Sequence, residues 1–306
     1  MKLLVLGSAA GGGFPQWNCN CRNCSGVRAG TVRARPRTQS SIAVSGRDPQ
    51  SWVLVNASPD IRAQLEANAA LQPARGARDT ALKAIVLVDA QIDHTTGLFT
   101  LRESGRAWPL YCTDRVNSDL TEGNPIFNVL SFYCGVERRR IDAGGEPFRI
   151  DAADGVAWRT LPVASKPPPF SPGRAAPAPG DNVALVLTDD TSGRSVLYAP
   201  GLGEIDDTVW QAMQAVDCVL VDGTFWTDDE MVGVGVSSKR ARDIGHLPQS
   251  GPGGMLEWLD RLPASTRKVL IHVNNTNPIL DEDSPERAAL TERGIEVAFD
   301  GMEIVP

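Results

Sequence analysis

Histidine is scarce in this sequence: only three of its 306 residues are histidine, at positions 94, 246 and 272. A site that needs four or more imidazole groups is therefore excluded by counting. Cysteine is also sparse, with six residues, too few for a fold held together by disulfides. No stretch approaches the roughly 18–20 consecutive apolar residues of a membrane helix, so we expect no membrane insertion.

Positive charge is not in excess either. Against 37 Asp and Glu there are 30 Lys and Arg, a net charge of -7, which argues against a surface built to bind nucleic acid or anionic lipid. The apolar run at the N-terminus ends at Gly7, short of the roughly seven or more residues of a signal-peptide core. We therefore expect a cytoplasmic protein without a nucleic-acid partner, whose thiols stay reduced and available to metals.

Short apolar runs rich in Val, Ile and Leu alternate with segments of helical periodicity. Runs of four to six residues bounded by Gly, Pro, Asn or Asp predict buried strands, and their alternation with helices predicts a layered α/β fold. With no internal repeat, we expect a single domain over residues 1–306. The expected strands are 3–6, 40–44, 52–55, 84–88, 183–187, 195–198, 218–221, 268–272 and 296–299, and the expected helices are 59–71, 205–216, 250–262 and 284–293.

Two segments interrupt this pattern. Residues 165–180 contain six prolines, which exclude regular structure and predict a surface loop or lid beside a site. Residues 227–239, with their alternating glycines and valines, predict a second loop.

Three cysteines crowd into a polar loop at residues 19–24, directly after a glycine-rich turn. Cys19, Cys21 and Cys24 have the spacing of a loop that wraps a tetrahedral Zn²⁺ ion. The spacing does not identify the fourth ligand, and Asn275, His246 and water are all candidates. The other three cysteines lie in apolar surroundings, where we expect them to pack in the core.

Three apolar runs far apart in the sequence each end in residues that bind metals. One is followed by Asp93 and His94, a second ends at Asp222, and a third ends at His272. A buried sheet fixes side chains at the ends of its strands, so these four residues predict a shared metal site.

These motifs resemble the metallo-β-lactamase superfamily over nearly the whole chain. The glycine turn, the cysteine loop, the Asp-His pair, Val221-Asp222, Gly245-His246 and Ile271-His272 occur in the superfamily's order. The resemblance implies a four-layer αββα sandwich. Within the superfamily, the strings at 7–19, 245–251 and 272–278 resemble a family of proteins that make pyrroloquinoline quinone (PQQ).

The chain departs from the superfamily in its first metal position. The usual loop reads His-x-His-x-Asp-His, but Asp89 and Gln91 replace its first two histidines, and no histidine occurs at 161–165. The resemblance therefore leaves only the second position, with Asp93, His94, Asp222 and His272 as ligands. A dinuclear zinc hydrolase is hard to sustain without both ions. We expect a mononuclear site.

Two imidazoles and a carboxylate with open positions are typical of non-haem Fe(II) oxygenases, although zinc could bind the same groups. The resemblance implies an iron-dependent hydroxylase that acts on a tyrosine (Glu-Tyr type) intermediate cut from the PQQ precursor peptide. The alternative is a carrier that takes PQQ or its precursor toward the periplasm without turnover. A zinc hydrolase is the less favoured reading.

Other residues have several interpretations at this stage. His246 resembles a proton-transferring histidine of the superfamily, or it caps a helix that starts near residue 250. Asp89 suits a supporting role behind the metal, and Gln91 could hold substrate. The basic cluster Arg28, Arg33, Arg35 and Arg37 is either a solvated face or a group that attracts the carboxylates of a peptide or quinone. We expect other PQQ biosynthesis proteins as partners and leave the choice between monomer and homodimer open.

Overall fold

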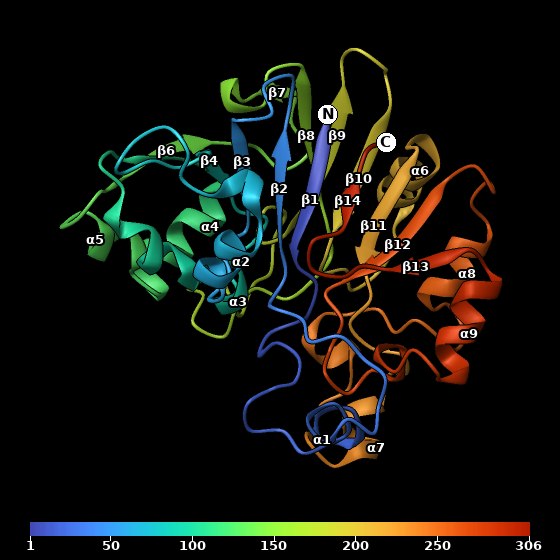
Figure 1. Cartoon of the computed structure of the whole chain (residues 1–306). Coiled ribbons are helices and arrows are strands. Elements are labelled where there is room, and N and C mark those ends of the chain that lie inside the picture. The colour runs from blue at the N-terminus through green and yellow to red at the C-terminus, as the bar shows by residue number, and fades with distance from the viewer.

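Two seven-stranded sheets lie face to face in the computed structural model, which describes all residues 1–306. Their strands run in the orders β14-β1-β2-β3-β4-β5-β6 and β13-β12-β11-β10-β9-β8-β7 (Figure 1). The first sheet contains β1 (Lys2–Gly7), β2 (Ser41–Ser45), β3 (Trp52–Val55), β4 (Leu82–Val86), β5 (Trp108–Cys112), β6 (Val136–Arg140) and β14 (Glu303–Ile304). The second contains β7 (Phe148–Arg149), β8 (Val156–Pro162), β9 (Val183–Asp189), β10 (Ser195–Ala199), β11 (Cys218–Asp222), β12 (Arg267–Ile271) and β13 (Ile295–Val297).

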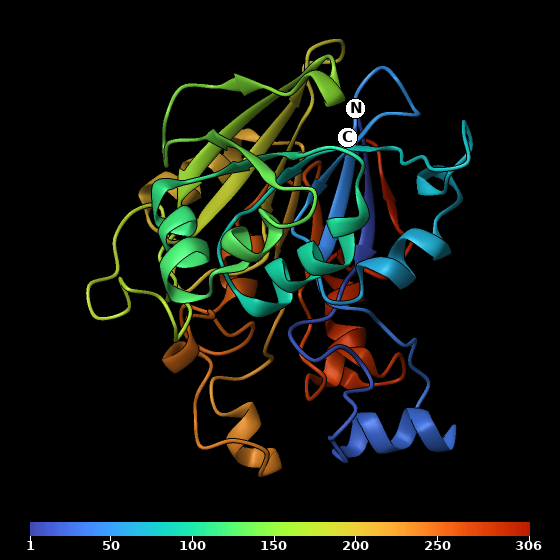
Figure 2. The ribbon, with the colours of Figure 1, turned by 90° about the vertical axis from the view of Figure 1, so that its left-hand side faces the viewer.

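Helices cover the outer faces of both sheets. Helices α2 to α5 lie beside the first sheet, and α6, α8 and α9 lie beside the second (Figure 1). Figure 2 views the molecule from the first side, with the helices coloured cyan to green in front of the strands. The helices are α1 (Arg22–Ala29), α2 (Ile61–Ala67), α3 (Ile92–Thr95), α4 (Asp114–Ser118), α5 (Ile126–Leu130), α6 (Asp207–Ala215), α7 (Glu230–Val234), α8 (Met255–Asp260) and α9 (Pro285–Glu292). Shorter helical turns are η1 (Ala69–Leu71), η2 (Thr96–Glu103), η3 (Asp119–Gly123), η4 (Asp151–Ala153), η5 (Arg242–Ile244) and η6 (Pro278–Leu280).

Alternate residues of the central strands enter different layers of the core. In β1, Leu3 and Val5 pack between the two sheets, whereas Leu4 and Leu6 pack against the helices outside. Strands buried on both faces need apolar residues at every position, which is why they read as continuous apolar runs. The expected four-layer αββα sandwich is confirmed.

The strand directions bring several strand ends to one edge of the sandwich. Strands β10, β11, β12 and β13 are parallel, and the pairing of β11 with β12 places Asp222 opposite Ile271. His272 therefore emerges next to Asp222. This edge lies at the end of the sheets away from the two chain termini (Figure 1).

All nine expected strands are present, and no end is shifted by more than two residues. The strands β5 to β8 and β14, and the helices α1, α3, α4 and α5, were not expected. One prediction was wrong: residues 227–239 contain α7 and are not loop throughout. The proline-rich segment 165–180 has no helix or strand, as expected. None of the helices is both long and apolar enough to cross a bilayer.

Candidate metal centres

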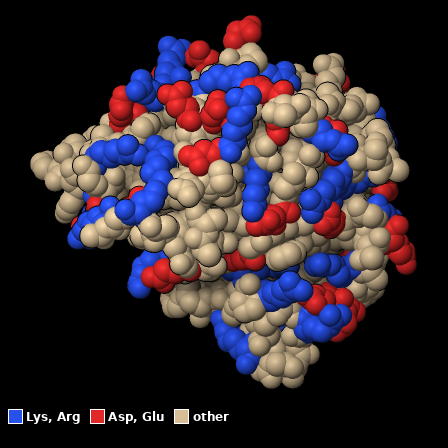
Figure 3. Space-filling model, turned by 45° about the horizontal axis from the view of Figure 1, so that its top comes forward, with Lys and Arg blue, Asp and Glu red and all other residues tan.

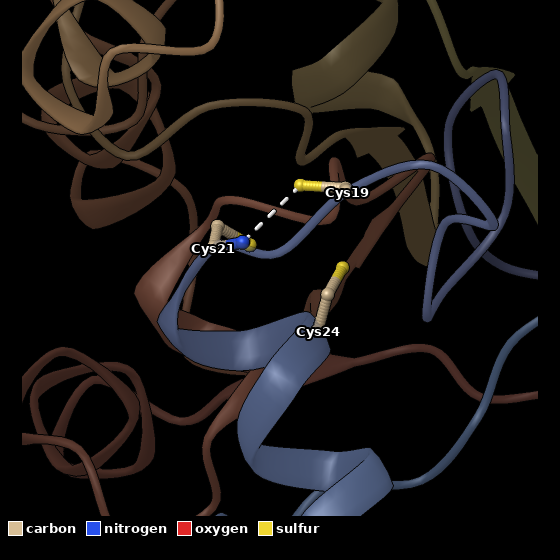
Figure 4. Close-up of side chains that lie close together, drawn as sticks. All are labelled: Cys19, Cys21 and Cys24. Atoms are coloured by element: carbon tan, nitrogen blue, oxygen red, sulfur yellow. Dashed lines mark hydrogen bonds between the residues drawn. The ribbon is translucent and has the colours of Figure 1, made fainter.

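The three cysteines of the N-terminal loop converge on one point, which we call the thiol cluster. Cys19 and Cys21 precede α1 and Cys24 lies in its first turn, so a tight turn brings the three sulfur atoms within 4.8 Å of one another (Figure 4). The backbone N–H of Cys21 donates to the sulfur of Cys19 at 3.5 Å (Figure 4). That of Gln16 donates to the sulfur of Cys24 at 3.4 Å. Donors of this kind stabilise thiolates, the form of cysteine that binds zinc.

Asn275 reaches into the middle of the thiol cluster. Its side-chain nitrogen lies 3.0, 3.7 and 3.4 Å from the sulfur atoms of Cys19, Cys21 and Cys24. Rotating the amide by half a turn would put its oxygen in the same place, where it could complete a tetrahedral site. Asn23 holds the segment there by donating to the backbone oxygen of Asn275 at 3.1 Å.

The pKa values of the thiols differ. Burial raises the pKa of Cys21 to about 11. For Cys19 burial acts in the same direction, but hydrogen bonds from Cys21 and neighbouring groups outweigh it and lower its pKa. Zinc binding at the thiol cluster would therefore displace at least the proton of Cys21.

A second group, the Asp-His cluster, consists of Asp93, His94 and His272, whose ligand atoms lie within 4.8 Å of one another. Asp93 and His94 lie on α3, which follows the end of β4, and His272 directly follows β12. The Asp93 Oδ2 atom is 3.2 Å from Nε2 of His272 and 3.9 Å from Nε2 of His94. The Nε2 atom of His94 is buried and has no hydrogen-bond partner, a need that a bound metal ion would satisfy.

Each imidazole of the Asp-His cluster has a hydrogen-bond partner at Nδ1, on the side of the ring away from Asp93. Both carboxylate oxygens of Asp89 lie within hydrogen-bond distance of His94 Nδ1, at 2.8 and 2.9 Å. Thr224 Oγ1 lies 2.9 Å from Nδ1 of His272. With each Nδ1 engaged, both rings present Nε2 toward Asp93, the arrangement by which outer partners orient metal-binding histidines.

The carboxylates around the Asp-His cluster also set its protonation. Burial disfavours a charged His94, but the nearby carboxylates of Asp89 and Asp93 outweigh it and raise the pKa of His94 to about 9. Burial likewise opposes charge on Asp93, yet interactions with His94 and His272 hold its pKa well below the usual range. The buried carboxylates thus favour positive charge at this point.

Asp222 and His246 form a pair on the other side of His272. Asp222 Oδ2 lies 2.6 Å from Nδ1 of His246 and accepts from the backbone N–H of Leu202 at 2.9 Å. Asp222 Oδ1 accepts from the backbone N–H and hydroxyl of Thr224, at 2.9 and 2.5 Å. Asp222 therefore groups with His246 and His272, and does not join Asp93 and His94.

His246 does not cap a helix. The next helix, α8, starts at Met255, so that alternative is wrong. The His246 ring stacks on His272 with centroids 5.3 Å apart. Burial would lower its pKa, but the charge and hydrogen bond of Asp222 prevail and raise it.

A cavity of about 270 Å³ joins the two groups. Asp93, His94, His246 and His272 line it, together with Gln91. The glycine turn is close to it: a side chain on Gly11 would come within 3.3 Å of Asp93 Oδ2. The first residue of the proline-rich segment, Ser165, also lines the cavity, and Gln91 Nε2 donates to the backbone oxygen of Lys166 at 3.0 Å.

Comparison with known proteins identifies the family. A model described as "Beta-lactamase superfamily domain" matches residues 51–273. Coenzyme PQQ synthesis protein B of Azoarcus sp. (strain BH72) is 65% identical over 99% of both chains, and that of Cupriavidus necator 61% over 99% of both. The chain belongs to the PqqB family.

Solved structures agree with this membership. Zn²⁺-bound PqqB from Methylobacterium extorquens has a TM-score of 0.91 at 38% identity, with complete coverage of both chains. A diphosphatase of the PhnP family has a TM-score of 0.66 at 19% identity, covering 99% of this chain and 96% of its own, and shares the fold alone. The resemblance to PQQ biosynthesis proteins is confirmed, and it assigns the chain a role in PQQ synthesis.

Two residues that line the cavity of this PqqB-family chain were not predicted from the sequence as site residues. Thr224 bridges His246 and His272, with Oγ1 at 3.1 and 2.9 Å from their Nδ1 atoms. Asn182 lines the cavity and is 6% exposed, and its side-chain nitrogen is buried without an acceptor. Thr224 follows a predicted ligand by two residues, which is a usable signal, whereas nothing in the sequence around Asn182 distinguishes it.

Proposed function

We propose that this chain is a mononuclear, iron- and O₂-dependent hydroxylase of PQQ biosynthesis that acts on a tyrosine (Glu-Tyr type) intermediate. The observation that carries this proposal is the Asp-His cluster: two imidazole Nε2 atoms and one carboxylate face the same cavity. Two histidines and one carboxylate with open positions match the ligand set of non-haem Fe(II) oxygenases.

Asp93, His94 and His272 would hold the iron in this proposal, and Asp222 positions His246. Bound there, Fe(II) would supply the one-electron and O₂ chemistry needed to hydroxylate a phenol ring. The prediction of Asp222 as a fourth ligand stays a prediction, but its oxygens already accept from Leu202 and Thr224. Asp89 would keep His94 oriented.

The remaining cavity residues would bind the substrate and move protons. His246 is held at Nδ1 by Asp222, which leaves Nε2 to exchange a proton with the phenol hydroxyl. The free amide nitrogen of Asn182 would donate to a substrate oxygen, and Gln91 would contact the substrate from the cavity wall.

Zinc would occupy the thiol cluster as a structural ion, with Asn275 as fourth ligand. Three sulfur atoms and an amide close such a site completely. The Methylobacterium relative binds Zn²⁺, and the cluster offers this chain a place for the same ion. Because such thiols must stay reduced, we also propose a cytoplasmic location, where other PQQ biosynthesis proteins would deliver the peptide.

The direct test is anaerobic reconstitution with Fe(II), followed by O₂, a chemical reductant and a Glu-Tyr peptide. We expect the peptide to gain mass in steps of one oxygen atom, with zinc-loaded protein as the control. No gain of oxygen with iron in place would overturn the proposal.

The alternative is a carrier of PQQ or its precursor. It predicts tight binding of the quinone that persists after the metal of the Asp-His cluster is chelated, with no turnover. Measuring quinone binding before and after chelation, on the same sample used for the oxygenation assay, separates the two functions.

A further inference from the structure

A second cavity, of about 350 Å³, lies away from the metal centres and shares no lining residue with the first. Its walls come from the segment that links α1 to β2, from α9, and from β13 and the residues after it. Three arginines line it: Arg35, Arg37 and Arg287.

Two of these arginines make no direct ion pair, although the hydroxyl of Ser8 connects Arg37 to the carboxylate of Asp300. Arg37 is only 4% exposed, and its Nη1 donates to the hydroxyl of Ser8 at 3.0 Å and to the backbone oxygen of Ala298. Its Nε is buried with no acceptor at all. Arg287 donates only to the backbone oxygen of Ile279, at 3.0 Å. Buried guanidinium groups are normally paired, because leaving one without an anion is costly.

The acidic side chains of the cavity are already neutralised. Glu282 pairs with Arg33 at 2.7 Å and with Arg35 at 3.3 Å, and Glu296 pairs with Arg267 at 2.7 Å. On the face shown in Figure 3, basic and acidic side chains lie interspersed. Among the arginines that line this cavity, only Arg35 makes a direct ion pair, whereas Arg37 and Arg287 make none.

The pKa values of both arginines are lowered mainly because burial disfavours their charged form. Burial lowers the pKa of Arg37 to about 10. The carboxylates of Asp300 and Glu282 oppose this shift, and repulsion from Arg287 and Arg35 adds to it. Burial and the neighbouring arginines lower that of Arg287 as well. A bound anion would stabilise the positive charges of both arginines.

The other walls of the cavity are apolar. Phe299, Met302 and Val297 line it, and the guanidinium of Arg35 lies over the Phe299 ring at 5.1 Å from its centroid. A small inorganic ion would leave these walls uncovered, whereas a flat organic body would cover them.

From these observations we propose that this cavity is a second ligand site, which binds a flat organic molecule carrying two or more carboxylates. Arg37 and Arg287 would each bind a carboxylate through charge-assisted hydrogen bonds, and Phe299 would pack against the flat body. The site needs neither metal centre.

The test uses trimesate (benzene-1,3,5-tricarboxylate), benzamide and inorganic phosphate as probes, with binding to the metal-loaded protein followed by calorimetry. We expect trimesate to bind, benzamide not to bind, and phosphate to bind more weakly than trimesate. Arg287→Gln should weaken trimesate binding by about tenfold or more, the loss expected for one charge-assisted contact. Arg293→Gln is the matched control, because Arg293 directly follows α9, pairs with Asp260 and does not line the cavity.

Absence of trimesate binding, or equal losses in Arg287→Gln and Arg293→Gln, would overturn the proposal. Phosphate binding as tight as trimesate would overturn the ligand class. Because Arg37 is buried, Arg35→Gln serves as the second variant at the rim, where a smaller loss is expected. Asp93→Asn should bind trimesate normally, so a failure of the proposed hydroxylase and a failure of this site are distinguished.

Discussion

The thiol cluster and the Asp-His cluster are assembled in opposite ways. The three cysteines lie within six consecutive residues, and one turn of chain brings them together. Asp93 and His94 are nearly 180 residues from His272 in the sequence, and only the two sheets bring them together. The cysteines are closed off by Asn275, whereas the Asp-His cluster borders a cavity. A closed site suits a structural ion, and an open one suits catalysis.

The largest expected effect is the loss of turnover in Asp93→Asn. The substitution keeps the shape of the side chain but removes the charge that balances the iron, so kcat should fall by at least about a thousandfold. Oxygenation of the Glu-Tyr peptide measures the loss, and thermal melting should change little. A large fall in melting temperature with turnover retained would mean that the roles of the two clusters are reversed. His94→Ala is a poorer test, because it would leave the buried Asp89 without its partner.

The next effect is on stability, at the thiol cluster. Cys21→Ser should remove one zinc ion per chain and cost about 3 kcal/mol or more of unfolding free energy, since structural zinc contributes folding free energy directly. Metal analysis and denaturant unfolding measure the two losses. Cys134→Ser, outside the cluster, is the control and should keep its zinc. Full zinc content in Cys21→Ser would contradict the assignment.

Asp89→Asn should weaken iron binding while leaving zinc in place. Removing the carboxylate behind His94 should cost about 10- to 100-fold in iron affinity. Turnover should recover at saturating Fe(II), a result that titration with the metal would show. Asp154→Asn, at an exposed ion pair with Arg47, is the control. If Asp89→Asn binds iron as the parent does, Asp89 has no orienting role.

The pH dependence of metal binding follows from His94. Without metal its pKa is raised to about 9, so at lower pH the ring must lose a proton before it can bind iron. Iron affinity should therefore fall about tenfold for each unit as the pH decreases from 8 to 6. Zinc affinity should also fall, because the pKa of Cys21 is raised to about 11. An iron affinity that does not change over this range would show that His94 is neutral or does not bind the ion.

The smallest expected effect concerns substrate binding. Asn182→Ala removes one hydrogen-bond donor from the cavity wall, so KM should rise about fivefold while kcat stays within about a factor of two. Steady-state kinetics with the Glu-Tyr peptide measure both. Asn128→Ala, on the exposed face of α5, should change neither value. A fall in kcat alone would instead place Asn182 in the chemistry.

The predictable parts of the fold were the strands buried on both faces. Their apolar runs, such as β3 and β11, can be read directly from the sequence. Strand β6, with the sequence Val-Glu-Arg-Arg-Arg, is half exposed at the edge of its sheet and gave no such signal. Helix α1 begins at Arg22, inside the cysteine motif, and lacks an apolar stripe. Such elements depend on tertiary contacts that a local pattern does not record.

In the candidate site, too, some residues could be predicted from the local sequence and others depend on tertiary contacts. Residue type and strand ends predicted Asp93, His94 and His272, and the structure brings them together. The direction of a side chain could not be predicted, so Asp222 appeared equivalent to them although it faces His246. A hydroxyl such as that of Thr224 is too common to stand out, and its role depends on the two rings that β11 and β12 place beside it.

One short segment serves both clusters. His272 adopts a left-handed backbone conformation with φ 61° at the end of β12, and Asn275 reaches the sulfur atoms only three positions later. Between them Val273 is fixed by its backbone N–H to the oxygen of Ser8 at 2.9 Å. Inserting or deleting a single residue between 272 and 275 would misplace one centre or the other. The spacing of this segment therefore constrains its length as well as its residue types, and any transplant of the cysteine loop into another protein of this fold has to keep this segment unchanged.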